Sequence, residues 1–164
     1  MPTFSFDVVS TYDKAEINNI FQQIQRDIAN RYDFRGTPAA VEWLGDKTGF
    51  VVTAANDMHL ESIQDIIRRA VIARNQSTKI LDLSATPVQG SMKLTQEIPF
   101  IEGLDQDKAK QITALIRDQF PKVKSQIQGQ EVRVQSAKKD ELQAVMQALR
   151  AADLDFPLSF QNLR

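Results

Sequence analysis

The sequence predicts an α+β fold of two tandem ferredoxin-like βαββαβ units, each an antiparallel sheet with helices on one face. First, the order strand, helix, strand, strand, helix, short strand occurs in residues 3–83 and again in 93–163. This order, with a hairpin in its middle, is that of the ferredoxin-like unit. Second, each predicted helix has a single apolar stripe, so it covers only one sheet face. Third, 164 residues suffice for two units of about 80 residues each.

The first half begins with a half-buried strand and a capped helix. Apolar and polar residues alternate from Phe4 to Val8, which is the period of a strand with one buried face. Asp13 is followed three positions later by a glutamate, and this capping box predicts a helix that runs to about residue 31. A turn at residues 45–47 joins two hairpin strands, a second helix follows, and residues 80–83 are predicted to form the short last strand.

The second half repeats this order with different residues. A strand over residues 92–101 is interrupted by Pro99, which favours an edge strand or a bulge. Asp105 is predicted to cap the helix that follows. Residues 123–135 form a hairpin that turns at Gly129 and Gln130, and Ser136 is predicted to cap the last long helix.

A connector is predicted between the two halves. Residues 75–90 contain a short apolar piece followed by Pro87 and Gly90, and no helical or strand period extends through them. We therefore predict one unit at residues 1–90 and the other at residues 91–164.

Composition excludes several classes of protein. The chain has no cysteine, is 42% hydrophobic and 25% charged, and has a net charge of −1. It contains no signal peptide pattern and no apolar run of the ~18 residues that a membrane span needs. We expect a cytoplasmic protein without a membrane association. With no cysteine and a single histidine, His59, we expect no metal site and no cofactor, and we expect His59 to be a surface residue of the second helix.

No set of residues predicts catalysis. A histidine-paired nucleophile cannot be assembled beyond His59. Asp105 with Asp107, and Asp153 with Asp155, are typical of helix caps and turns. No glycine-rich phosphate loop is present. We therefore predict a protein that binds rather than an enzyme.

The hairpin of the second half is the strongest candidate for a binding surface. If its valines face the helices, the opposite face carries amides and cations, namely Lys124, Gln126, Gln128, Arg133 and Gln135. Glutamine amides can both donate to and accept from base edges, and arginine can pair with phosphate. The same face could also be a solvated sheet surface or the contact between the two halves. Its central strand lacks the aromatic residues on which RNA-recognition modules stack bases.

Two further segments combine groups suited to anions. Arg31-Tyr32-Asp33-Phe34-Arg35-Gly36 interleaves arginines with aromatics, which could hold a stacked base and its phosphate. The alternative is that the aromatics are core anchors and the arginines pair with carboxylates. Lys138 and Lys139 follow Ser136 at a predicted helix N-terminus, where free backbone N–H groups favour an anion. Both lysines belong to a segment, 108–139, whose net charge is +6 while the rest of the chain carries −7.

Three blocks of the sequence, residues 31–36, residues 125–134 and residues 156–162, together resemble the bacterial YajQ family of nucleotide-binding proteins, and the resemblance covers the full chain. It implies two ferredoxin-like units related by duplication, and it allows an exchange of their first strands. It also implies nucleotide binding, with cyclic di-GMP signalling and RNA association both proposed within the family and no settled enzymatic activity.

We therefore predict a non-catalytic protein that binds a nucleotide or a cyclic dinucleotide such as cyclic di-GMP and signals through a partner, such as a transcription factor. The predicted contacts are Arg133 and Lys138 for phosphate, Gln126 and Gln128 for base edges, and Arg31, Tyr32 and Arg35 as a second set, with Lys139 as a further nucleotide-binding residue. Two alternatives stay open. The first is an adaptor whose polar sheet face docks a transcription or RNA-processing partner without a ligand. The second is weak binding of structured RNA through the +6 segment.

Overall fold

Two four-stranded antiparallel sheets, each with two long helices, make up the protein. The computed structural model describes residues 3–164. By their internal contacts these residues form two compact units. We call Tyr12–Ile101 the central unit, and the residues up to Thr11 together with Glu102–Arg164 the terminal unit. Each unit has the strands and helices of a ferredoxin-like unit, so the predicted fold class is confirmed.

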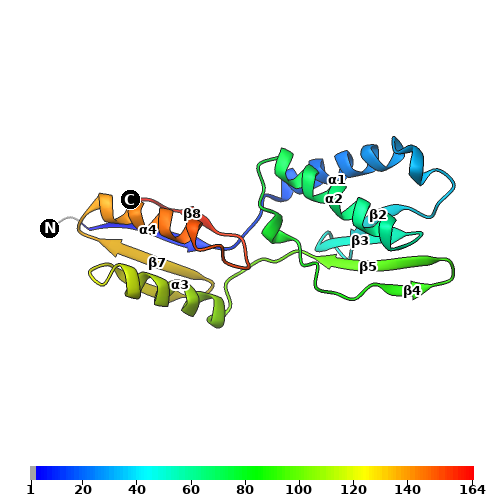
Figure 1. Cartoon of the computed structure of the whole chain (residues 1–164). Helices are drawn as coiled ribbons and strands as arrows, with labels where there is room; N and C mark the ends of the chain where they lie inside the picture. The colour runs from blue at the N-terminus through cyan, green and yellow to red at the C-terminus, as the bar shows by residue number, and fades with distance from the viewer. Residues whose placement is uncertain (1–2) are drawn as a thin grey trace. The chain divides into compact units, whose positions relative to one another are not determined.

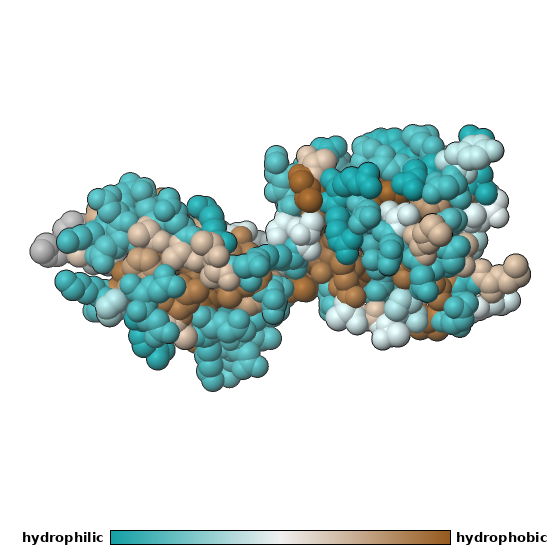
Figure 2. Space-filling model, in the orientation of Figure 1, coloured by the Kyte–Doolittle hydropathy of each residue, from teal (hydrophilic) through white to brown (hydrophobic). Residues whose placement is uncertain are grey.

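The central unit has a sheet in the order β2-β3-β5-β4. The helices α1 and α2 lie on one face of this sheet (Figure 1), and Figure 2 shows mostly hydrophilic residues over their outward surface. The bounds of its elements are α1 Lys14–Ala29, η1 Tyr32–Phe34, β2 Ala40–Leu44, β3 Gly49–Ala54, α2 Asp57–Ala73, η2 Thr78–Ile80, β4 Val88–Gly90 and β5 Lys93–Pro99.

The terminal unit has a sheet in the order β6-β7-β1-β8. The helix α3 contacts β6 and β7, and α4 contacts β7 and β1. The bounds of its elements are β1 Phe4–Val9, α3 Gln106–Gln119, β6 Lys124–Gln128, β7 Glu131–Ser136, α4 Lys139–Ala151 and β8 Ser159–Gln161.

The first strand of each half lies in the sheet of the other half. β1 pairs with β7 and β8, both from the second half, whereas β5 pairs with β3 and β4 from the first half. The compact units therefore differ from the division into 1–90 and 91–164, and each sheet still has the ferredoxin-like strand order. The physical reason is that an apolar–polar alternation specifies which strand face is buried and not which sheet receives the strand.

Two local expectations were wrong. Residues 80–83 do not form a strand, because Thr78–Ile80 is a 3₁₀ turn followed by an isolated bridge between Leu81 and Phe100. The short last strand of this half is β4, which lies inside the predicted connector. The N-cap of α4 is Lys138 rather than Ser136, and its side chain makes no capping hydrogen bond.

Both units have their own apolar core between sheet and helices. In the central unit the isoleucine stripes of α1 and α2 pack with Phe50 of β3, which is fully buried. In the terminal unit Phe6 of β1 is fully buried and makes an edge-to-face contact with Phe160 at 5.5 Å between ring centres. None of the helices in residues 3–164 combines the length and the apolar character that a membrane span requires.

Gly49 is required where β3 passes close to β5. An added Cβ would lie 2.4 Å from the carbonyl oxygen of Ile98 and 2.7 Å from the Cα of Pro99, both backbone atoms of the neighbouring strand. We expect Gly49→Ala to lower the free energy of unfolding by about 1–3 kcal/mol, because the strands must move apart. Urea denaturation measures this loss.

Gly90→Ala is the matched control for this substitution. Gly90 lies in the edge strand β4, where an added Cβ would meet its nearest neighbour, the Cγ of Lys93, at an ordinary 3.6 Å. Equal losses of stability in the two variants would contradict the close approach at Gly49.

Candidate functional site

The predicted polar face of the β6–β7 hairpin exists. Lys124 pairs with Gln135, Gln126 with Arg133, and Gln128 with Glu131, and residues directly opposite each other share a sheet face. Val132 and Val134 are fully buried on the opposite face, towards the helices. We call the polar sheet face the surface formed by Lys124, Gln126, Gln128, Glu131, Arg133 and Gln135.

β1 continues this face with a buried carboxylate. Asp7 pairs with Arg133 across the two strands, and it is only 2% exposed. Arg133 donates from Nε to Oδ1 of Asp7 at 3.0 Å, and Asn162 donates from Nδ2 to Oδ2 at 2.8 Å. The hydrogen bond from Arg133 is the main cause that holds the pKa of Asp7 below its ordinary value, against the opposing effect of burial. The same hydrogen bond raises the pKa of Arg133.

A bulge after β8 places Asn162 on this carboxylate. Asp7 is paired with Gln161, whereas Ser5 exchanges backbone hydrogen bonds with Arg164. The chain advances three residues from Gln161 to Arg164 while β1 advances only two between Asp7 and Ser5. One extra residue on one strand is the signature of a β-bulge. Asn162 has a φ of +56°, a left-handed conformation that asparagine adopts more readily than most residues.

The contact with Asp7 changes the interpretation of Arg133. Sequence reasoning selected this residue for phosphate, but its Nε is engaged by a buried carboxylate. Its side chain is 37% exposed, so the rest of the guanidinium still reaches the polar sheet face. The main observed role of Arg133 is to pair with Asp7. Without Arg133, Asp7 would keep a single side-chain donor among the residues described. Gln126 is exposed and Gln128 half-buried on the same face.

A hollow of about 270 Å³ lies at the end of the polar sheet face next to the start of α4. Lys122 and Lys124 are exposed, and neither forms an ion pair within residues 3–164. Sequence reasoning missed Lys122 as a site residue, and the signal that could have found it is its position two residues before Lys124, at the entry to β6. We call this surface the lysine hollow, and its lining is Thr3, Lys122, Lys124, Gln135, Ser136 and Ala137.

Lys138 and Lys139 follow directly on the lysine hollow, and both are exposed. The hydroxyl of Ser136 accepts from the backbone N–H of Lys138 at 3.0 Å and donates to Glu141 Oε1 at 3.1 Å. The Ser136 hydroxyl therefore both accepts and donates a hydrogen bond within the β7–α4 junction and stabilises that junction. Four lysines thus gather at this end of the terminal unit, beside Asp140 and Glu141 in the first turn of α4.

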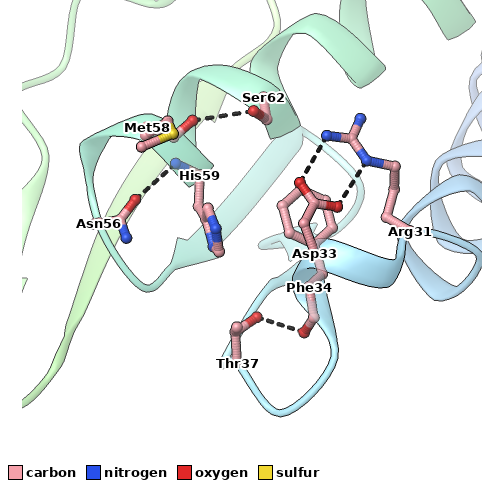
Figure 3. A network of polar contacts seen from close by, with 8 residues as sticks. All are labelled: Arg31, Asp33, Phe34, Thr37, Asn56, Met58, His59 and Ser62. Carbon is pink, nitrogen blue, oxygen red and sulfur yellow. Dashed lines mark hydrogen bonds and ion pairs between the residues drawn. The ribbon is translucent and has the colours of Figure 1, made fainter.

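The second predicted contact set lies in the central unit. Arg31 donates from two nitrogens to the two carboxylate oxygens of Asp33, each at 2.9 Å (Figure 3). This pairing lowers the pKa of Asp33 and raises that of Arg31. Phe34 is buried, and the Arg31 guanidinium carbon lies over its ring, 5.0 Å from the ring centre. Arg31 thus pairs with a carboxylate and Phe34 is buried, which are the contacts that the structural alternative expects.

Tyr32 and Arg35 differ from their neighbours. Tyr32 is 81% exposed, and the Arg35 guanidinium lies 5.3 Å from its ring centre. This exposed cation–π pair could accept a planar ligand. It belongs to a different unit from the polar sheet face, so the structure does not bring the two predicted contact sets together within one unit.

His59 is not the surface residue expected. It is half-buried, its ring meets Phe34 edge-on at 5.2 Å between centres, and its Nδ1 has no hydrogen-bond partner among the described residues. Figure 3 shows the ring turned towards Phe34, beside the Arg31–Asp33 pair. Residues 3–164 contain no group of three or more histidine, aspartate or glutamate side chains that could hold a metal ion.

Comparisons with known proteins give a consistent result over the whole chain. The model of a family described as nucleotide-binding protein YajQ-like matches residues 4–164. The chain is 42% identical to a nucleotide-binding protein of Mycolicibacterium gilvum, with 100% of both chains covered. It is 41% identical to a nucleotide-binding protein of Nostoc punctiforme and 37% identical to one of Synechococcus, covering 99% of this chain and 98% of each relative. These names describe binding and no catalysed reaction.

The buried carboxylate makes stability depend on pH in a defined direction. We expect Asp7→Asn to lower the free energy of unfolding at neutral pH by about 1.5–3 kcal/mol, the range for hydrogen bonds to charged groups. The folded-state pKa of Asp7 is lowered, so its contribution is complete above the unfolded value of about 3.9 and is lost as the pH falls through the folded value. Urea denaturation over a pH series should show the two proteins converging in acid.

Asp33→Asn serves as the control, because it also breaks an arginine–carboxylate pair, but an exposed one. Its effect at neutral pH should be smaller than that of Asp7→Asn. A stability difference between wild type and Asp7→Asn that stays constant down to the lowest pH at which both remain folded would contradict the assigned role of the carboxylate.

Proposed function

Because this chain belongs to the YajQ-like family, whose relatives are named nucleotide-binding proteins, we propose that it binds a nucleotide on the terminal unit, with a phosphate in the lysine hollow. The observation that carries the proposal is the pair Lys122 and Lys124, two exposed cations that have no ion-pair partner within residues 3–164 and lie at one end of a face with several amides. Lysine is a common phosphate ligand.

The base would lie along the polar sheet face. Gln135 lines the lysine hollow, and Gln126 lies on the next strand and the same sheet face, two pairs further along the ladder. Their amides, with Gln128 beyond them, can donate to and accept from the edge of a base. The exposed part of Arg133, held in place by Asp7, offers a planar cation on which a base can stack.

More specifically, we propose that the nucleotide is a cyclic dinucleotide. The lysine hollow, at about 270 Å³, is slightly smaller than the ~300–1,000 Å³ typical of pockets for drug-sized ligands, so it suits one phosphate with part of its sugar. The second phosphate of cyclic di-GMP would need another cation, and Lys138 and Lys139 follow the hollow directly. Such a protein would act without catalysis, as an effector that reports the bound nucleotide to a protein partner.

The binding test uses the two lysines that line the hollow. Three or four charge-assisted contacts of about 1.5–3 kcal/mol each support micromolar affinity after the entropy of association. We expect isothermal titration calorimetry with cyclic di-GMP, GTP and ATP to show saturable binding of at least one of them. The double substitution Lys122→Ala with Lys124→Ala should weaken it at least about tenfold.

Lys110→Ala with Lys108→Ala is the charge-matched control, since both lysines lie on α3 and neither lines the hollow. Arg133→Ala is unsuitable as a binding test because it removes the partner of Asp7. Equal weakening in the two double variants, or no binding of any nucleotide to the wild type, would contradict the proposal. Without nucleotide binding, capture of a protein partner would favour the adaptor, and a steep loss of RNA affinity with salt would favour RNA binding.

A further inference from the structure

The polar sheet face carries opposite charges at its two ends. The lysine hollow occupies the end at Gln135, whereas Glu131 pairs with Gln128 at the other end, next to the β6–β7 turn. Four residues of β7 separate Gln135 from Glu131, which is about 13 Å at the rise of a strand. A nucleotide whose phosphate lies in the lysine hollow therefore presents its base, and not its phosphate, to Glu131.

The carboxylate of Glu131 is not neutralised by the protein around it. Glu131 is half-buried, and it forms no ion pair or side-chain hydrogen bond with any residue from 3 to 164. Arg133 lies two residues further along β7 on the same face, but its Nε donates to Asp7. Glu131 is the weakest of the influences on the pKa of Arg133. Both carboxylate oxygens therefore remain available to donors from a ligand.

An amide lies directly beside this carboxylate. Gln128 is half-buried and stands opposite Glu131 on the neighbouring strand. Side chains paired in this way have Cβ atoms about 4.5–5.5 Å apart. The side chain of Gln128 also forms no hydrogen bond within the described part of the chain, so its amide can turn towards the same ligand. The pair thus offers two acceptor oxygens next to one amide donor.

Guanine is the base whose edge matches this pattern. Its Watson–Crick edge presents two adjacent donors, N1–H and the N2 amino group, followed by the acceptor O6. A carboxylate can accept from two parallel donors at once, as it does from arginine, and an amide can donate to O6. Adenine presents a lone pair at N1 where guanine presents a donor, so a carboxylate there would oppose it. Cytosine and uracil each present a single donor group.

From this match we infer that Glu131 is the residue that selects guanine nucleotides at the site of the proposed function, on which this inference rests. The guanidinium of Arg133, held by Asp7, would stack on the base, and the edge of the base would point along β7 to Glu131. A carboxylate at this end also opposes a phosphate there, which determines the direction in which the nucleotide lies. Glu131 thus distinguishes bases, whereas the lysines hold the phosphate.

Isothermal titration calorimetry of the whole protein with GTP, ATP and ITP separates these contacts, because the base of ITP lacks the N2 amino group. We expect the wild type to bind GTP at least about tenfold more tightly than ATP, with ITP between them, since ITP loses one charge-assisted hydrogen bond and ATP loses both. Glu131→Gln should reduce the preference for GTP over ATP to about threefold or less without weakening the binding of ATP. Its fold should be unchanged, since the described residues give Glu131 no partner to lose.

Asp118→Asn is the charge-matched control, because this exposed carboxylate lies on α3 and outside the polar sheet face. It should keep the full preference for GTP. Lys122→Ala with Lys124→Ala should weaken GTP and ATP by the same factor, since these lysines would contact only phosphate. Equal affinities of the wild type for GTP and ATP, or a preference that survives in Glu131→Gln, would overturn the inference and leave the proposed function standing. A wild type that binds none of the three nucleotides would contradict both.

Discussion

The buried carboxylate of Asp7 is the interaction on which the terminal unit depends. An anion that is 2% exposed is stable only when donors surround it. Arg133 supplies one donor from β7, and Asn162 supplies another from the bulge that follows β8. Both neighbours of β1 are thereby held to it, although they are 126 and 155 residues away along the chain. A strand without a carboxylate at this place would leave both donors without their acceptor.

The other exchanged strand uses a neutral group for the same purpose. Gln96 of β5 is 4% exposed and lies on the helix side of its sheet. Its Oε1 accepts from Gln64 of α2 at 2.7 Å, and its Nε2 donates to the carbonyl of Ala85 at 2.9 Å. Each exchanged strand thus carries one buried polar side chain whose partners come only from its own unit. A misplaced or slipped strand would leave such groups unpaired, so both residues disfavour other sheets and registers for these strands.

The sequence predicted the elements better than their partners. The apolar–polar alternation between Phe4 and Val8 identified a strand. A strand with this alternation could pair in either sheet, so the pattern could not predict the exchange of β1 and β5. The polar sheet face followed from the hairpin register, which depends only on neighbouring residues. The partner of Arg133 did not, because 126 residues separate it from Asp7. The lysine hollow brings together Thr3, residues 122–124 and residues 135–137, which only the folded sheet places side by side.

Duplication accounts for the shared fold of the two units, and the side chains of their open sheet faces show where they have diverged. At the middle of the central sheet, Glu42, Val51 and Glu97 lie in one row across three strands, with Ala40, Thr53 and Thr95 in the next row. The corresponding rows of β6, β7 and β1 contain Gln126, Arg133 and Asp7, then Lys124, Gln135 and Ser5. These rows of the first face carry two carboxylates and no amide, whereas those of the second carry Lys124, two glutamine amides and an Arg133 that is paired with Asp7. Nucleotide binding on a sheet face therefore suits the terminal unit, and the exchanged strand β1 is the element that holds Arg133 in that face.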